Sequence, residues 1–434
     1  MKNSFAKFWG LFLIAALACV APAFADENEN QALKSEVKSL NTKLDALERQ
    51  VQVLNSGSHE NKTAYVPSAQ EGSALKGITI SGFVDTQYNN NFSQHNQNPS
   101  VAAAGAGNPL RSFDNNQNTF TVNNVEFDIE KLANPEGGAG FRVDMSAGED
   151  MRAVNAANTS AAANSDFGLQ QAYVQLVAPL HAFDGSDVFG NAIDIKAGRF
   201  VTLAGAEVIE GKDNWNISRS FMFGLGIPFT HTGVRATYGL FKNKVTTYFG
   251  LNNGWDANVD NNTWKTWEAG WTANPMDKVS FTQAMYFGAE NANQNGHHRF
   301  LLTNVASYQA TDKLALKAEL NVGAQRRIVS TTTTNFDNAQ WFGLALYGRY
   351  ALTDKFGMAY RFELFRDINQ ARTLAAGAAF GTSTLWEQTI TADYKIYENL
   401  LGRVEYRFDK SNETNAFGEG SQSTLGAQLI YSFA

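Results

Sequence analysis

From residue 77 to the end of the chain, apolar and polar side chains alternate within short segments. The alternation is strict in 125–130, and the same period of two recurs in 141–145, 314–322, 403–409 and 425–433. A period of two places successive side chains on opposite faces of a β-strand. Repeated segments of about ten such residues are typical of a transmembrane β-barrel, in which one strand face meets lipid and the other meets water. A soluble β-sandwich also alternates, but its strands are shorter and its apolar faces pack against each other.

The connections between these segments alternate between tight turns and long loops. The tight ones lie at 134–137, 242–243, 276–278, 311–313, 353–355 and 397–399. The long ones lie near 90–116, 148–167, 200–230, 253–262, 290–297, 327–338, 368–383 and 411–421. Short turns at one end and long loops at the other characterise outer-membrane barrels. Eight hairpins predict an all-β antiparallel barrel of about sixteen strands, which is wide enough to keep a water channel in its interior.

Aromatic residues recur toward the ends of the predicted strands. Such residues form girdles at the two membrane–water interfaces, where their amphipathic rings sit at the level of the lipid headgroups. The residues that we assign to these girdles are Trp264, Trp267, Trp271, Tyr286, Tyr308, Trp341, Tyr347, Tyr350, Tyr360 and Trp386.

Residues 1–25 carry the pattern of a secretory signal peptide. Lys2 and Lys7 precede an apolar stretch at 8–20, and Ala23 and Ala25 are the small residues expected before a cleavage site. We predict cleavage after Ala25. One alternative is a retained anchor helix, for which the apolar stretch is short. Another is a lipoprotein site at Cys19, the only cysteine of the chain.

Residues 26–55 carry an unbroken heptad repeat. Its apolar positions, spaced alternately by 4 and 3 residues, are Leu33, Val37, Leu40, Leu44, Leu47, Val51 and Leu54. This spacing predicts a short α-helical coiled coil in the periplasm that joins copies of the chain. The alternative is an amphipathic helix that docks on its own barrel. Val at a with Leu at d favours two strands, so a dimer stays open beside the trimer considered below. Residues 56–76 are polar and predict a flexible linker before the barrel at 77–434.

The composition excludes several classes of protein. Aromatic residues make up 12% of the chain and hydrophobic residues 44%, which is too much for a disordered protein. The formal net charge of −7 argues against nucleic-acid binding. Beyond the signal peptide, no uncharged apolar run approaches the length of a membrane-spanning helix. A single cysteine cannot form an intramolecular disulfide.

Several short segments carry a family resemblance when they are taken together and in order. They are SGFVD at 81–85, QAYV at 171–174, AGRF at 197–200, PFTHTGVR at 228–235, NGWD at 253–256 and RVEYRFD at 403–409. With them, residues 77–433 resemble the outer-membrane β-barrel porins related to OmpL. The resemblance implies a porin-like barrel and no particular substrate. A coiled coil ahead of a barrel is also similar to certain sugar porins whose periplasmic helices associate, which favours a trimer.

The end of the chain departs slightly from the pattern of barrel porins. These proteins commonly finish on an aromatic residue that the assembly machinery reads, whereas here Ala434 follows Phe433. Tyr431 and Phe433 keep the aromatic pattern of the last strand, so the resemblance implies that they serve as the assembly signal.

The long connection at 201–229 is the strongest candidate for a functional segment. In general porins the third loop folds into the lumen and narrows it, and this connection is similar in position. Opposed charges at such a constriction select solutes by size and charge. The alternative is an ordinary surface loop. The candidates for the constriction and lumen are Lys196, Arg199, Glu207, Glu210, Asp213, Arg219, Arg235, Arg361, Arg403, Glu405 and Arg407. Strand charges among them have a second interpretation, in which they only compensate their neighbours.

Catalytic and metal-binding motifs are weak throughout the sequence. No nucleophile motif accompanies any histidine, although an enzyme would need such a pair within hydrogen-bond reach. The neighbours His297 and His298 would point apart in extended chain and could not share a metal ion. Asp256 and Asp260 lie in an Asn- and Asp-rich loop that hints at calcium but lacks the spacing of a calcium loop.

We therefore predict a non-enzymatic outer-membrane porin without a cofactor or a bound metal. It would form a water-filled channel for ions and small hydrophilic solutes, contact outer-membrane lipid, associate into homo-oligomers and bind no nucleic acid. The alternative is a structural envelope spacer or adhesin that the barrel anchors, with the coiled coil as a bridge.

Overall fold

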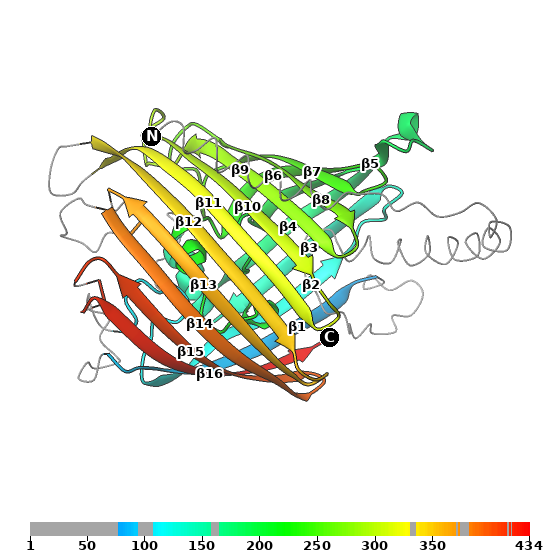
Figure 1. Ribbon diagram of the computed structural model, residues 1–434. Coiled ribbons are helices and arrows are strands. Elements are labelled where there is room, and N and C mark those ends of the chain that lie inside the picture. The colour runs from blue at the N-terminus through cyan, green and yellow to red at the C-terminus, as the bar shows by residue number, and fades with distance from the viewer. Residues whose placement is uncertain are drawn as a thin grey trace, which may run out of the picture. The chain divides into compact units, whose positions relative to one another are not determined.

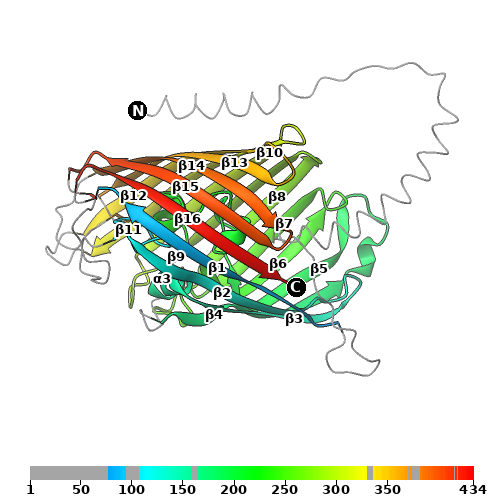
Figure 2. The same ribbon diagram turned by 90° about the horizontal axis from the view of Figure 1, so that it is seen from below.

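The barrel closes on itself through sixteen antiparallel strands. The computed structural model describes residues 77–93, 107–157, 165–329, 336–369, 372–373, 382–414, 416–417 and 419–434. Within them each strand pairs with its neighbours in sequence, and β1 (Thr79–Asn91) pairs with β16 (Ser421–Phe433), as Figures 1 and 2 show. The predicted all-β antiparallel barrel and its strand number are confirmed. The predicted signal peptide, heptad residues and linker lie outside the described residues.

The remaining strands follow in chain order. They are β2 (Thr119–Lys131), β3 (Gly138–Ala147), β4 (Phe167–Pro179), β5 (Phe189–Val201), β6 (Thr230–Leu240), β7 (Val245–Asn252), β8 (Thr266–Met276), β9 (Val279–Ala289), β10 (His298–Gln309), β11 (Leu314–Val329), β12 (Phe336–Ala351), β13 (Phe356–Ile368), β14 (Thr382–Tyr397) and β15 (Leu400–Ser411). Short helical elements are α3 (Glu149–Ala157), the 3₁₀ turns η1 (His181–Phe183) and η2 (Gly211–Asp213), and the π-helical turn η3 (Met222–Gly226). In the described part of the chain, no helix has the length and apolar character that a membrane span requires.

Turns and loops segregate to opposite ends of the barrel, as the sequence indicates. The β6–β7 turn is tight because Phe241, Lys242 and Asn243 all adopt positive φ, between 53° and 62°. The β4–β5 connection at 180–188, which contains η1, is the one hairpin turn that the sequence pattern did not reveal. Long connections at the other end include 202–229, between β5 and β6.

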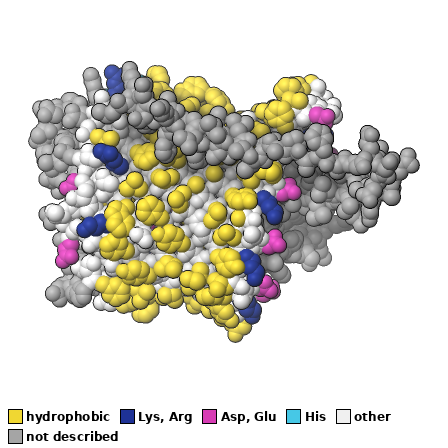
Figure 3. All heavy atoms as spheres, in the orientation of Figure 1, with side chains coloured by type: hydrophobic (Ala, Val, Ile, Leu, Met, Phe, Trp, Pro, Cys, Tyr) yellow, Lys and Arg dark blue, Asp and Glu magenta, His cyan; other side chains and the backbone are white. Residues whose placement is uncertain are grey.

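Along the strands the apolar side chains are exposed and the polar ones are buried, the reverse of a sheet in a soluble protein. In β15, Val404 is 53% exposed and Tyr406 is 43% exposed, whereas Arg403, Glu405 and Arg407 between and beside them are buried. Figure 3 shows the outer surface as a broad field of hydrophobic side chains, with charged ones confined to its two ends. Closure pairs the strand backbones, so this surface can lie in lipid while the polar faces enclose the lumen.

The predicted aromatic girdles are correct only in part. Trp267, Tyr308 and Tyr350 are exposed on the outer surface. Tyr286, Trp341 and Tyr347 point inward and are buried, so their assignment to the girdles was wrong. The reason is register, since a shift of one residue along a strand moves a side chain to the opposite face.

A hydrophobic core lies inside the barrel rather than between packed sheets. It combines loop residues such as Phe113, Phe223 and Phe229 with Met151 from α3 and Trp341 from β12. Phe113, Phe223 and Phe229 form a cluster of rings with centroids 5.2–5.5 Å apart. This core gives the inserted loops a fixed position relative to the strands.

Candidate constriction inside the barrel

Residues 202–229 cross the interior of the barrel, and we call them the inserted segment. The backbone N–H of Leu203 donates to the hydroxyl of Tyr286 on β9, at 3.0 Å. The N–H of Ala206 donates to Glu319 on β11, also at 3.0 Å. Further along, the segment contacts β13 and β15, so it spans a large part of the wall.

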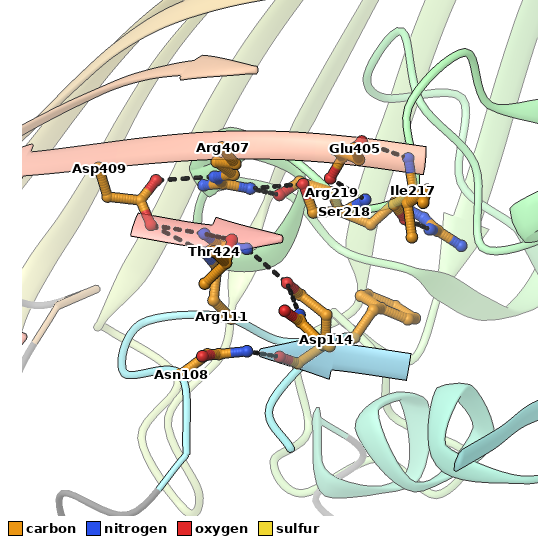
Figure 4. Close-up of polar contacts among 12 residues, drawn as sticks. Asn108, Arg111, Asp114, Ile217, Ser218, Arg219, Glu405, Arg407, Asp409 and Thr424 are labelled. Atoms are coloured by element: carbon orange, nitrogen blue, oxygen red, sulfur yellow. Dashed lines mark hydrogen bonds and ion pairs between the residues drawn. The ribbon is translucent and has the colours of Figure 1, made fainter. Parts of the chain in front are cut away.

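Wall carboxylates accept the backbone N–H groups of the inserted segment in pairs. Glu405 accepts those of Ile217 and Ser218, at 2.6 and 2.9 Å, as Figure 4 shows. Glu363 accepts those of Phe221 and Met222, at 2.7 and 2.5 Å. A buried chain without regular structure needs such partners, because an unpaired peptide group away from water is costly.

Wall arginines bind the carbonyl oxygens of the same segment. Arg361 donates to the carbonyl of Ser218 at 2.6 Å, and Arg407 donates to that of Arg219 at 2.5 Å. Arg403 donates to the carbonyls of Gly211 and Asn214, at 2.8 and 2.6 Å. The lumen therefore carries acidic side chains that bind the N–H groups of the inserted segment and basic side chains that bind its carbonyl groups.

Ion pairs join these wall residues to one another. Arg361 bridges Glu207 of the inserted segment, at 2.6 Å, and Glu387 of β14, at 2.5 Å. Arg361 and Glu387 are completely buried. Removal of one partner from such an arrangement would leave a buried charge without compensation.

A second chain of ion pairs ties another loop to this network, as Figure 4 shows. Asp409 accepts from Arg407 and from Arg111, both at 2.7 Å. Arg111 also pairs with Asp114, and both belong to the connection between β1 and β2. Two long loops and β15 thus form one polar network.

The pKa values of two loop carboxyl groups are shifted in opposite directions. Burial alone would raise the pKa of Glu207, but the Arg361 guanidinium and the hydrogen bonds from Ser220 outweigh it and lower that pKa. Burial raises the pKa of Asp256 to about 6, although its Oδ1 accepts the N–H groups of Phe229 and Thr230, both at 2.8 Å. Asp256 therefore helps to hold the end of the inserted segment.

Only a few charges of the inserted segment reach water. Arg219 folds back on its own segment and donates to the carbonyl of Ile217 at 2.7 Å, and Glu210 accepts from Gln170. Lys212 and Asp213 pair at 2.6 Å, with each side chain 20% exposed. This pair therefore gives the segment accessible charge of both signs, beside the half-buried Glu210.

The structure brings some of the candidate residues together and separates others. Glu207, Arg361, Arg403, Glu405 and Arg407 meet at the inserted segment. Lys196 lies instead over the ring of Tyr173 at 4.7 Å, Arg199 donates to Thr230 at 3.2 Å, and Arg235 pairs with Glu268 at 2.8 Å. The contribution of each candidate to solute passage stays a prediction.

Water reaches one part of the wall more than another. Tyr173, Gln175, Thr237, Tyr248 and Thr272, which face the lumen on β4–β8, remain half-buried. Wall residues beneath the inserted segment are fully covered, including Glu387, Thr389, Arg407 and Asp409. The inserted segment thus occupies the side of the lumen formed by β11–β15.

Sequence reasoning did not select several residues of this network. Glu387 and Asp409 were not among the candidates, nor were Arg111 and Asp114 of the first long loop. Glu387 and Asp409 occupy polar positions of alternating strands, which was the available signal. Arg111 and Asp114 lie in a loop, where no periodicity distinguishes them.

Other predicted residues also have defined positions. Phe433 packs its ring 5.6 Å from that of Phe127, and Tyr431 is exposed on the outer face. Their role in assembly stays a prediction. His231 is buried and stacks on Tyr286 with ring centroids 4.8 Å apart. Across the described residues, no three His, Cys, Asp or Glu side chains form a group that could hold a metal ion.

Comparisons with known proteins agree with the barrel geometry. Residues 77–433 match the family model described as "Putative beta-barrel porin-2, OmpL-like". Among solved structures, the outer membrane channel DcaP of Acinetobacter baumannii is similar at 12% identity, with 83% of this chain and 99% of that chain covered and a TM-score of 0.54. A loop-deletion mutant of OmpT from Vibrio cholerae has 9% identity, coverages of 82% and 99%, and a TM-score of 0.50. These identities show a shared fold alone. No curated protein matches the chain.

Proposed function

Because this chain belongs to the OmpL-like β-barrel porin family and is an outer-membrane porin, we propose that ions and small hydrophilic solutes diffuse through it past a constriction formed by the inserted segment. The observation that carries this proposal is the clamp on residues 202–229, whose backbone is held by charged wall residues. A loop held in this way keeps a constant distance from the opposite wall, and so limits the size of passing solutes.

Charge selectivity in this proposal comes from residues that water can reach. Glu363, Glu405, Arg361 and Arg407 are occupied by the backbone of the inserted segment and are buried beneath it. The Lys212–Asp213 pair remains accessible and carries both signs. We therefore expect a weakly selective channel in which size discriminates more strongly than charge.

The test is ion conduction by the purified full chain in planar lipid bilayers. We expect discrete single-channel steps and permeation of small sugars into liposomes. Lys212→Glu should shift the permeability ratio toward cations, and Asp213→Lys should shift it toward anions. Lys278→Glu, in the exposed β8–β9 turn, is the matched control and should leave the ratio unchanged. A protein without ion steps would overturn the channel and leave the spacer or adhesin alternative.

We also propose that the chain associates into a homo-oligomer, a trimer or a dimer, through the periplasmic coiled coil. Its support is the heptad repeat from Leu33 to Leu54 in the sequence. Chemical cross-linking of the full chain in detergent would reveal the number of subunits. Replacement of Leu40, Leu44 and Leu47 by Asp should abolish the cross-linked species, since charges in the seam prevent helix association. Persistence of the same species would place the contact elsewhere.

A further inference from the structure

Three basic side chains mark the loop end of the outer surface between β11 and β15. They are Arg326, Arg366 and Lys410, one on each of β11, β13 and β15, and all are exposed. We call these three residues the basic row. The long loops lie at this end, which in an outer-membrane barrel is the extracellular end.

The direction of the basic row follows from its neighbours in sequence. Arg366 lies between Phe365 and Asp367, both of which are fully buried and point inward. Lys410 lies between Asp409 and Ser411, which are also buried. Because side chains alternate along a strand, Arg366 and Lys410 point away from the lumen. Arg326 follows the buried Gln325 and is exposed.

The row stands at the boundary of the apolar surface. Two positions before each basic residue, on the same strand face, is an apolar one: Ala324, Leu364 and Phe408. The ring of Phe408 lies 5.5 Å from that of Trp386, an aromatic pair of the kind found at membrane interfaces. In Figure 3 the charged side chains of this face stand at its two ends, outside the apolar field. The basic row is therefore at the depth of the lipid headgroups.

The charges of the basic row are not neutralised by described residues. Other exposed cations at this end are in ion pairs: Arg152 with Asp166 at 2.7 Å, and Lys265 with Asp260. None of Arg326, Arg366 and Lys410 forms an ion pair with any residue that the structure describes. Each cation is thus available to an anion of the surroundings.

The row is confined to one side of the barrel. At the loop ends of β2 and β4 the outward residues are Phe120, Val122, Phe167 and Leu169, all exposed and apolar. Members of the row occupy alternate strands, which lie roughly 10 Å apart. Thr384 pairs in register with Arg366 and Trp386 pairs with Lys410, so these two cations are offset by two residues along the strands. This spacing lets each cation contact its own phosphate.

We propose that the basic row binds the phosphate groups of the glycolipid that forms the outer leaflet of the outer membrane. Guanidinium groups match phosphate with paired hydrogen bonds, and basic residues at a headgroup boundary attract anionic lipid. Outward orientation, headgroup depth and positive charge that no described residue pairs together favour a lipid phosphate as the occupant. The bound lipid would cover the face formed by β11–β15.

The experiment measures binding of lipid A to the full chain in detergent micelles, by native mass spectrometry. The variant is R326Q/R366Q/K410Q. The matched control is K278Q/K313Q/K355Q, which removes three exposed lysines from turns at the opposite end. Removal of one basic residue near a charged lipid surface weakens binding about fivefold, so the triple variant should bind on the order of a hundredfold more weakly. The control should bind lipid A as the parent chain does.

A second arm uses lipid A from which the phosphates have been removed. The parent chain should bind this lipid about as weakly as the triple variant binds lipid A. R326K/R366K keeps the charges and should retain most of the affinity. Equal losses in the triple variant and its control would overturn the proposal, as would equal affinity of the parent chain for the two lipids. Unchanged single-channel conductance of the triple variant would show that its barrel is intact.

Discussion

Glu363 and Glu405 should decide whether the inserted segment stays against the wall. Together they accept four backbone N–H groups, from Ile217, Ser218, Phe221 and Met222. Replacement of both glutamates by alanine would leave these donors buried without partners. We predict that in the double variant residues 217–222 loosen from the wall and that single-channel conductance increases.

The loss of these four bonds is large enough to loosen residues 217–222, while Arg361 and Arg407 still bind the carbonyls of Ser218 and Arg219. Removal of the acceptor leaves a buried N–H group without a partner at a cost of about 1–3 kcal/mol, so the four together cost roughly 4–12 kcal/mol. Contacts that hold the segment in place include the buried side chains of Ile217, Phe221 and Met222. Burial of each contributes about 1.5–3 kcal/mol, or roughly 5–9 kcal/mol in total. The polar loss is therefore similar in size to the apolar burial of these three side chains. Water in the lumen could then hydrate the released N–H groups.

The assay combines planar-bilayer conductance with limited proteolysis of the barrel. Loosening should expose residues 217–222 to cleavage as well as raise conductance. The E363Q/E405Q variant keeps an acceptor oxygen at each position and should show a smaller change in both readouts. Glu398→Ala, in the exposed β14–β15 turn, removes the same kind of side chain and should behave as the parent chain. Parent-like conductance and protease resistance of the E363A/E405A variant would refute the backbone clamp.

Three further predictions concern stability. Arg361→Ala removes the ion-pair partner of the buried Glu207 and leaves the buried Glu387 with Arg407 alone, at 3.7 Å, and should lower the free energy of unfolding by about 3–5 kcal/mol; chemical denaturation checks this, and a loss below about 1 kcal/mol would contradict it. Burial raises the pKa of Asp256 to about 6. The contribution of this carboxyl group to the free energy of unfolding is therefore fully present below its unfolded pKa of 3.8. It is lost as the pH rises through 6, which costs roughly 3 kcal/mol. Asp256→Asn should therefore reduce the fall in thermal stability between pH 4 and 7, and an unchanged slope would count against the assignment. Val404→Arg places a charge on the lipid-facing surface and should lower the free energy of unfolding in lipid vesicles by about 2–4 kcal/mol. A refolding equilibrium equal to that of the parent chain would contradict this prediction.

Part of the candidate site could be predicted from the sequence. The third long connection was identified from its length, its charged residues and its position, and the inserted segment coincides with it. What the charges do was not predictable in the same way. Arg361 and Glu405 could be assigned to an inward strand face by alternation, but their backbone partners lie 143 and 188 positions away in sequence. No local pattern reports a contact over such a separation.

The sequence by itself determined the approximate number of strands, most of the alternation of turns and loops, and the water-avoiding face of the strands whose alternation is strict, because these depend on a period of two and on local turn chemistry. Only the tertiary structure decided that Tyr286, Trp341 and Tyr347 point into the lumen, because register is set by pairing with neighbouring strands. It also decided that the strand charges clamp a peptide backbone, because closure of the barrel brings β11–β15 around the segment between β5 and β6.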